Sequence, residues 1–295
     1  MRVLITGANG FLGKSFIRLS KTYEFQVSAL DISFDNFDSG VDYHIGSITD
    51  KKLLEVALNG VDVVVHFAAI ADIGYSISNP SRAYEINILG TNLLLEIAAK
   101  FRVRHLVFSS TLYVNGNKGG HYRISKKACE EIIEYYSLNF GLTYTILRIG
   151  SVYGPDANNF NFIYQAIKSG LEQKKIYRKG IGNELREYIH VDDVNKYVLN
   201  IIKDQLFVSQ KVLLSGSEKL RVKDLLYMLS EMLGGDVEII FDKESKYDGH
   251  YIHTPNTFSP DLISKVTLEN PIDLASGLLD CIGHVNKELQ DDNII

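Results

Sequence analysis

Two side chains suited to proton transfer stand four residues apart in the segment Tyr122-Arg123-Ile124-Ser125-Lys126. On a helix this spacing brings both onto one face, one turn apart. A tyrosine hydroxyl has a reference pKa of about 10 and is a poor base at neutral pH, but a nearby ammonium favours the phenolate. We therefore expect Lys126 to lower the pKa of Tyr122, so that the phenol can exchange a proton with a substrate hydroxyl.

A second pair, Tyr164 and Lys168, has the same spacing, and a chain with 17 tyrosines is expected to contain such a pair by chance. Context separates the two pairs. Only Tyr122 follows an apolar, strand-like segment that ends in hydroxyl side chains, at 109–111. We favour Tyr122 and Lys126 as the catalytic pair and interpret the other pair as a solvent-facing helix surface.

A glycine-rich turn opens the chain, in the sequence RVLITGANGFLG from Arg2 to Gly13. The glycines follow an apolar run short enough for a buried strand. Gly7 allows a sharp turn, Gly10 lets a pyrophosphate approach the backbone, and Gly13 permits close packing of the next helix. The phosphates would lie on the N–H groups at the start of that helix. A purely structural turn is the alternative, but the strand before it and the helix after it favour dinucleotide binding.

An acidic residue, Asp31, ends the second strand-like segment, 25–30. A carboxylate at this point accepts hydrogen bonds from the ribose diol of NAD and repels the 2′-phosphate of NADP. No arginine follows Asp31 to attract that phosphate. The sequence therefore predicts NAD as the cofactor. Its positively charged oxidised nicotinamide would act together with Lys126 to favour the phenolate of Tyr122.

Apolar segments and helical patterns alternate through the first half of the chain, which is typical of a parallel sheet covered on both faces. We expect strands at 3–5, 25–30, 41–45, 61–67, 106–108 and 142–147. Helices are expected through 16–19 and over 50–58, 79–100 and 122–139. The predicted fold class is α/β, a Rossmann-type doubly wound parallel sheet with a smaller C-terminal lobe.

The regular alternation ends near Ser151, where glycines and a proline break the chain into short elements. Later helices are expected at 192–203, at 222–233 and from 272 onward. We divide the chain into an NAD-binding domain at 1–150, with 186–204 returning to it, and a mainly substrate-binding lobe at 151–295. That lobe would close over the carboxyl ends of the strands, where open α/β sheets bind ligands.

The composition is that of a globular protein, with 295 residues, 45% of them hydrophobic, and a formal net charge of −5. The chain has no long basic run, which disfavours nucleic acid as a partner, and no apolar run approaches the length of a membrane span. Cys129 and Cys281 are interpreted as buried thiols, and no metal site is expected. These features predict a cytoplasmic enzyme.

Several motifs occur in order along the chain: TGANGFLG, Asp31, HFAA at 66–69, NILGTN at 87–92, FSST at 108–111, Tyr122 with Lys126, RIGSVYGP from Arg148, and REYIHVDDV from Arg186. Together they resemble the extended short-chain dehydrogenase/reductases, in particular the NAD-dependent epimerase/dehydratase family that acts on nucleotide sugars. The resemblance covers most of the chain and fades after about Asp204.

The resemblance implies a role for each matching residue. Thr111 would orient the sugar hydroxyl, Tyr122 would exchange its proton, and Lys126 would bind the nicotinamide ribose. The other implied cofactor-binding residues are Gly7, Gly10, Phe11, Leu12, Asp31, Ser47, Ile48, Phe67, Ala68, Ala69, Asn87 and Ser109. The implied substrate-binding residues are Thr111, Ser151, Asn159 and Arg186.

Arg186 would hold the diphosphate, because a guanidinium matches it in charge and bidentate geometry. A surface ion pair with Glu184 or Glu187 is the alternative. The family also implies a homodimer formed through the helices near 87–100 and 122–139.

The chain departs from the family pattern near the expected site. Ser47 stands where an aspartate is common beside the adenine, and Ser151 stands where an asparagine is usual near the substrate phosphates. The segment between Thr111 and Tyr122 is short and lacks a proline-rich stretch.

A further departure lies in the C-terminal lobe, which lacks the arginine expected around 248–255 and has His250 and His253 there. These histidines are candidates for a phosphate contact, with solvated loop residues as the alternative. The nucleotide moiety of the substrate therefore stays open.

The residues after Thr111 narrow the reaction. Sugar 4,6-dehydratases of the family carry an Asp-Glu pair there as acid and base, whereas this chain has Leu112-Tyr113, and the glutamate of the family's decarboxylases is also absent. The chemistry that remains is hydride transfer with one proton relay. We expect a nucleotide-sugar C4 epimerase working through a transient keto-sugar. A keto-sugar reductase or dehydrogenase and a non-catalytic dinucleotide-binding sensor are the alternatives.

Overall fold

The larger lobe of the protein is built on a parallel β-sheet. The structure is a computed structural model that describes residues 1–244 and 263–292. The eight strands of the sheet are β1 (Arg2–Thr6), β2 (Gln26–Asp31), β3 (Val41–Ile45), β4 (Val63–His66), β5 (His105–Thr111), β6 (Thr143–Ile149), β11 (Gln210–Leu214) and β14 (Ser264–Lys265). They lie in the order β14-β11-β6-β5-β4-β1-β2-β3, and all neighbours run parallel. The order reverses between β1 and β4, which confirms the doubly wound, Rossmann-type sheet.

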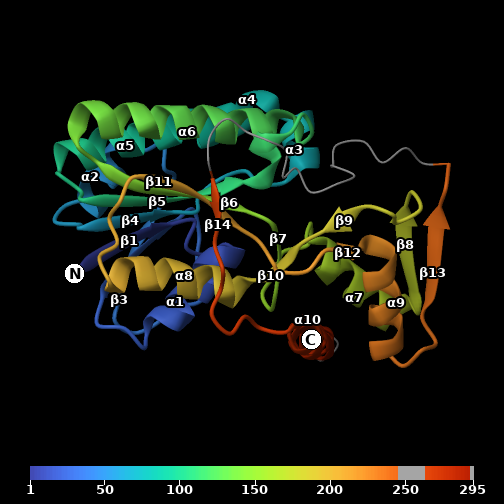
Figure 1. Ribbon diagram of the computed structural model, residues 1–295. Coiled ribbons are helices and arrows are strands. Elements are labelled where there is room, and N and C mark those ends of the chain that lie inside the picture. The colour runs from blue at the N-terminus through green and yellow to red at the C-terminus, as the bar shows by residue number, and fades with distance from the viewer. Residues whose placement is uncertain (245–262, 293–295) are drawn as a thin grey trace.

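Helices cover both faces of this sheet (Figure 1). One face carries α1 (Phe11–Ser20) and α8 (Val191–Lys203), and the other carries α2 (Lys51–Ala57), α5 (Thr91–Lys100) and α6 (Gly120–Phe140). Because the central strands are buried on both sides, they need apolar residues at successive positions. This explains the apolar runs at 3–5 and 63–65, which have no exposed surface.

The helix expected over 79–100 is divided. It consists of α4 (Pro80–Tyr84), a π-helical turn η1 (Glu85–Gly90) and α5. In the wide turn, the Thr91 hydroxyl and the Cys129 thiol donate to the Asn87 carbonyl oxygen, over 2.6 and 2.9 Å. A π turn changes the helical phase without a compositional signal, so the sequence pattern did not predict it. The pattern also missed the short helix α3 (Ile73–Ser78) before it.

A smaller lobe follows β6 (Figure 1). It contains three strand pairs: β7 (Ser151–Tyr153) with β10 (Tyr188–His190), β8 (Lys175–Lys179) with β13 (Glu238–Asp242), and β9 (Leu185–Arg186) with β12 (Leu220–Arg221). Its helices are α7 (Phe162–Gln173), α9 (Val222–Met232) and α10 (Leu274–Asp292). These elements enclose a third apolar core of their own.

The chain returns to the main sheet more often than the sequence predicted. Helix α8 packs against α1, within the segment 186–204 that we expected to return. Strands β11 and β14 also join the sheet, although we assigned their residues to the lobe at 151–295. The β11 sequence QKVLL begins with two polar residues and is too short to show a period, so it was not recognised as a strand. A division at residue 150 therefore cuts through the sheet.

Cys129 and Cys281 are buried and form no disulfide, as the sequence predicted. Within residues 1–244 and 263–292, no helix has an apolar stretch long enough to cross a bilayer. His250 and His253, the candidates for a phosphate contact, lie outside the described residues.

Candidate functional site

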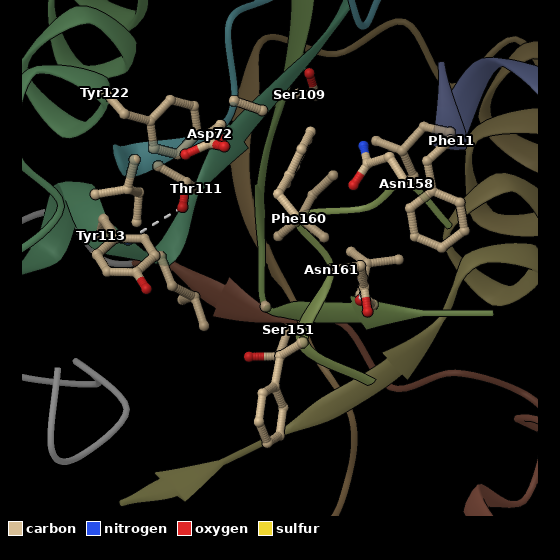
Figure 2. Close-up of a pocket in the computed structure, with 18 of the residues that line it drawn as sticks. Phe11, Asp72, Ser109, Thr111, Tyr113, Tyr122, Ser151, Asn158, Phe160 and Asn161 are labelled. Carbon is tan, nitrogen blue, oxygen red and sulfur yellow. Dashed lines mark hydrogen bonds between the residues drawn. The ribbon is translucent and has the colours of Figure 1, made fainter. Parts of the chain in front are cut away.

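One pocket collects many of the predicted site residues (Figure 2). It encloses about 710 Å³ where the carboxyl ends of β5 and β6 and the start of α1 meet the smaller lobe. The predicted residues that line it are Gly10, Phe11, Leu12, Phe67, Ala69, Ser109, Thr111, Tyr122, Lys126, Ser151 and Arg186. Lining residues that the sequence analysis did not assign include Asp72, Tyr75, Tyr113, Asn158, Phe160, Asn161, Phe162, Arg178 and Tyr188.

The glycine turn at the start of α1 has no room for side chains. Gly7 has a φ of +71°, and a Cβ added there would lie 2.5 Å from the backbone nitrogen of Ala68. A Cβ on Gly13 would lie 2.3 Å from the carbonyl oxygen of Gly7. Gly10 is the N-cap residue of α1 and provides no capping side chain. The first backbone N–H groups of this ten-residue helix therefore have no side-chain cap from Gly10, and the turn fits the pyrophosphate of a dinucleotide.

Asp31 lies directly behind this turn. Its Oδ2 accepts a hydrogen bond from the backbone N–H of Asn9 at 2.9 Å, and its Oδ1 accepts one from Ile32 at 2.7 Å. Burial raises the pKa of Asp31, while these backbone hydrogen bonds oppose the rise. The nearby loop carries a second carboxylate, Asp35, paired with Lys14 at 2.7 Å. The acidic surroundings fit a ribose diol better than a 2′-phosphate.

The proposed catalytic residues lie together. Lys126 is 2% exposed, and its Nζ donates to the carbonyl oxygen of Ser109 at 2.7 Å. The same nitrogen lies 6.0 Å from the centre of the Tyr122 ring. Figure 2 shows Tyr122 and Thr111 on one side of the pocket, with Asn158 on the other.

In the protein without cofactor the pKa of Tyr122 is raised, so Lys126 by itself does not lower it; the joint effect of Lys126 and the nicotinamide of NAD stays a prediction. Burial raises the pKa of Tyr122 to about 12, and only a hydrogen bond with Thr111 opposes the rise. Burial also lowers the pKa of Lys126 to about 8, against the attraction of Cys129 and Glu130. Desolvation is the largest influence on both groups, and it disfavours the charge on each of them.

The second Tyr/Lys pair lies elsewhere. Tyr164 donates to Glu288 of α10 at 3.1 Å and packs at the edge of the third core. Neither Tyr164 nor Lys168 lines the pocket. The interpretation of Tyr164 as a solvent-facing residue is therefore wrong, because α10 covers this side of α7.

A buried ion pair supports the catalytic side of the pocket. Arg148 of β6 bonds Glu130 of α6 at 2.6 Å, and the two side chains are 6% and 2% exposed. Ser110 of β5 also donates to Glu130, and Arg148 donates at 2.6 Å to Asn115 of the 3₁₀ turn η2 (Leu112–Asn115). The pair thus holds β5, β6, η2 and α6 together. Its only sequence signal is a charged residue within the otherwise buried β6.

A second glycine turn explains why the segment before Tyr122 can be short. Gly119 has a φ of +97° and Gly120 has a φ of +51°, conformations that favour glycine. A Cβ on Gly119 would lie 2.8 Å from the ring of Tyr113. The chain can therefore turn directly from η2 into α6.

Several predicted residues do not line the pocket, namely Gly7, Asp31, Ser47, Ile48, Ala68, Asn87 and Asn159. Ser47 bonds the Thr49 hydroxyl at 2.8 Å, and Ile48 is 4% exposed. Asn87 is 1% exposed, and its amide is hydrogen-bonded to Ile70 and Ser125. Asn87 therefore positions other elements of the site.

One of the predicted substrate-binding residues lies outside the pocket, and its neighbour in the sequence lines the pocket instead. Asn159 is exposed outside the pocket, whereas Asn158 and Asn161 line it. The Oδ1 of Asn158 is buried and has no partner within the described residues. Three asparagines in the run NNFN marked the region, but sequence alone could not decide which of them turns inward.

Arg186 lines the pocket and is only 6% exposed, so the alternative of a surface ion pair is wrong. The two carboxylates proposed for that pair bond other cations. Glu184 pairs with Arg178 at 2.8 Å, and Glu187 pairs with Lys265 at 2.8 Å. The Arg178 guanidinium also lies 4.8 Å from the centre of the Phe162 ring. The sequence analysis did not assign Arg178, because its β8 sequence shows only surface-like alternation.

Comparisons with known proteins agree on one relationship. Residues 3–212 match the model of the NAD dependent epimerase/dehydratase family. A putative UDP-glucose 4-epimerase from Methanocaldococcus jannaschii is 27% identical, over 85% of this chain and 88% of its own length. A dTDP-glucose 4,6-dehydratase from Mycobacterium tuberculosis is 26% identical, over 89% of this chain and 87% of its own.

A solved structure shows the same fold. The UDP-glucuronic acid 4-epimerase from Bacillus cereus, in complex with UDP-glucuronic acid and NAD, superposes with a TM-score of 0.86. It is 22% identical to this chain, and the match covers 98% of this chain and all of that one.

Proposed function

Because the chain belongs to the NAD-dependent epimerase/dehydratase family and is an NAD-dependent enzyme, we propose that it epimerises a nucleotide sugar at C4 through a transient keto-sugar. The observation that carries this proposal is a single pocket. It is lined by Thr111, Tyr122 and Lys126 together with the start of α1 after the glycine turn. A proton-transferring group and a dinucleotide site thus share one cavity.

The residues present fit NAD. The first turn of α1 would hold the pyrophosphate, Asp31 the adenosine ribose, and Lys126 the nicotinamide ribose. NAD, when bound, supplies the acceptor and later the donor of a hydride. Phe67 and Ala69 offer an apolar wall that would keep water from the reacting atoms.

Tyr122 would exchange the proton of the sugar hydroxyl. Its raised pKa keeps the phenol protonated at neutral pH, so it needs nearby positive charge to act as a base. The hydrogen bond with Thr111 lowers this pKa, and we expect the Lys126 ammonium together with the positively charged nicotinamide of NAD to lower it further. Arg186, in the smaller lobe, would hold the diphosphate and set the distance of the sugar from Tyr122.

The pocket favours epimerisation over dehydration. Elimination of water needs an acid and a base beside the sugar, but Leu112 and Tyr113 line the pocket where the family's dehydratases carry that pair. Among the described lining residues, Asp72 is the one carboxylate. One carboxylate cannot supply both roles of the Asp-Glu pair.

The test is turnover of a panel of UDP-, dTDP- and GDP-hexoses with NAD, followed by NMR of the product sugar. We expect the C4 epimer without net accumulation of NADH. Tyr122→Phe should lower kcat by about 10²–10⁴-fold, because it removes the group that transfers the proton. Tyr164→Phe, the matched control, should leave kcat unchanged.

Other products would contradict the proposal in distinct ways. Stoichiometric use of NADH with a keto-sugar would indicate a reductase, and a 4-keto-6-deoxy product would indicate a dehydratase. A sensor would bind NAD and show no turnover with any sugar of the panel.

We also propose that the protein is a homodimer that pairs through α6. Ile124, Tyr135 and Leu138 of this helix are 43%, 60% and 84% exposed, and their spacing of 11 and 14 residues places them on one face. In Figure 1, α6 lies on the outer side of the sheet, away from α1 and α8. Leu89 of η1, the turn that leads into neighbouring α5, is 62% exposed as well. A second copy of the chain would cover this apolar face.

A further inference from the structure

A carboxylate, Asp72, stands at the catalytic end of the pocket. It immediately precedes α3, and α3 packs against α6, the helix that carries Tyr122. Figure 2 shows Asp72 on the same side of the pocket as Tyr122 and Thr111. A negative charge therefore lies where the proposed function places the sugar.

Hydrogen bonds connect the segment that precedes Asp72 to α6, the helix that carries Tyr122. The Asn87 amide accepts from the Ile70 N–H at 2.7 Å and donates to the Ile70 carbonyl at 3.1 Å. It also donates to Ser125 Oγ at 2.9 Å, and Ser125 Oγ donates to the Tyr122 carbonyl at 2.8 Å. These bonds tie the backbone at Ile70, two residues before Asp72, to the turn of α6 that carries Tyr122.

Only one oxygen of Asp72 has a structural role. Oδ1 accepts from the Tyr75 N–H at 3.0 Å and caps α3. Oδ2 has no hydrogen-bond partner within the described residues and can accept from a hydroxyl of a ligand. Asparagine caps a helix about as well as aspartate, so the charge can be removed while the cap is kept.

The guanidinium groups of the pocket and its carboxylate, Asp72, come from opposite sides of it. These guanidinium groups, Arg178 in β8 and Arg186 in β9, come from the smaller lobe, and each residue is 6% exposed. On the other side, the lining cation is Lys126, whose Nζ already donates to Ser109 at 2.7 Å. Arg178 already pairs with Glu184 at 2.8 Å, so Arg186 is the cation that would meet a diphosphate, while Asp72 presents negative charge to the sugar. A carboxylate on the sugar would face the like charge of Asp72.

We propose that Asp72 restricts this pocket to nucleotide sugars with an uncharged hexosyl group and excludes hexuronyl groups. The inference rests on the proposed function and specifies its substrate class. The fold alone does not impose this restriction, because the Bacillus cereus structure with the same fold is a complex with UDP-glucuronic acid.

The test compares the affinity of UDP-glucose with that of UDP-glucuronate by calorimetry, with saturating NAD and in a Tyr122→Phe background that prevents turnover. The parent protein should bind UDP-glucose at least about tenfold more tightly. Asp72→Asn should reduce this ratio by about tenfold or more, mainly by tightening the binding of UDP-glucuronate. Asp50→Asn, which makes the same change in the cap of α2, should leave the ratio unchanged.

Three outcomes would overturn the inference. Equal binding of both sugars by the parent, or the same ratio in Asp72→Asn, would contradict the role of Asp72 and leave the proposed function intact. Binding of neither UDP-sugar, nor of the dTDP- and GDP-hexoses of the same panel, would contradict the proposed function together with the inference. A thermal melt checks the fold of each variant, and Asp72→Ser, which also keeps a capping side chain, replaces Asp72→Asn if that variant unfolds.

Discussion

At the scale of single residues, burial of the two proposed proton-transfer groups disfavours the charges that their roles require. Tyr122 is half-buried and Lys126 is buried, and this desolvation disfavours their charged forms, so the pKa of Tyr122 rises to about 12 and that of Lys126 falls to about 8. One uncharged group, the Thr111 hydroxyl, opposes the rise in the pKa of Tyr122 through its hydrogen bond with the phenol. Removal of that hydrogen bond should therefore have a clear signature in the dependence of activity on pH.

We predict that Thr111→Val lowers kcat/KM by at least about tenfold and moves the pH limb assigned to Tyr122 to higher pH. The hydrogen bond from Thr111 lowers the pKa of Tyr122, so its loss leaves the effect of burial unopposed. The measurement is kcat/KM from pH 6 to pH 10 with saturating NAD, because we expect its positively charged nicotinamide to bring the limb below the value of about 12 for the protein alone. Thr111→Ser keeps the hydroxyl and serves as the control. A profile of Thr111→Val that coincides with that of the parent would show that Thr111 does not act on the phenol.

The residue types predicted the kind of chemistry better than they predicted which side chains face the pocket. The types and spacing of Thr111, Tyr122 and Lys126 were sufficient to place them in one pocket, because they follow a strand and share a helix face. Asp72 was missed because the short helix α3 that it caps was itself not predicted, so nothing in the sequence placed this aspartate near Tyr122. Arg178 was missed for a similar reason, as nothing in an alternating strand indicates that one of its charged residues is buried.

At the scale of secondary-structure elements, the paired strands β5 and β6 enclose an imidazole. His105 bonds Thr143 at 2.8 Å and Thr145 at 3.0 Å, and burial lowers its pKa to about 4. The unfolded chain binds a proton to His105 below pH 6.5, while the folded protein does so only near pH 4. Between these values the unfolded state binds more protons, so stability decreases as the pH falls.

We predict that His105→Gln flattens the acid side of the stability curve. His105 contributes a slope of up to about 1.4 kcal/mol per pH unit between pH 6.5 and pH 4, and an uncharged glutamine removes it. His66, with a pKa lowered to about 3, maintains a similar slope in both proteins. Urea denaturation at pH 5 and pH 7 gives the two free energies of unfolding. An unchanged difference between them in the variant would mean that His105 is already charged in the native protein.

The elements themselves were predictable wherever each was buried on one side or both. All six strands expected before residue 150 are present, because apolar runs bounded by turns leave few alternatives. The π turn η1 and the late strands β11 and β14 were not predictable. The π turn is accompanied by side-chain hydrogen bonds from Thr91 and Cys129 to the Asn87 carbonyl. Strand β11 pairs with β6, and β14 pairs with β11, so both need a sheet edge that is already formed.

At the scale of the whole molecule, we predict that Leu138→Glu converts the proposed dimer into a monomer. Leu138 is 84% exposed and belongs to none of the apolar cores, so its replacement should not disturb the fold. In a face-to-face contact between two α6 helices, a charge at this position would be desolvated. Sedimentation velocity measures the change. Leu279→Glu, at a 57% exposed position on α10, is the matched control and should leave the mass unchanged. A parent protein that sediments as a monomer would contradict the proposed dimer.

The late return of β11 to the sheet has a consequence for synthesis. Strand β6 leaves the ribosome about 60 residues ahead of β11, its partner on one side, and at 5–20 residues per second this interval lasts about 3–12 s. Throughout it, the nascent chain presents an open row of backbone donors and acceptors along β6, which a neighbouring nascent chain can occupy. The first part of the smaller lobe, residues 151–190, must therefore be translated before β11 can cover this side of β6.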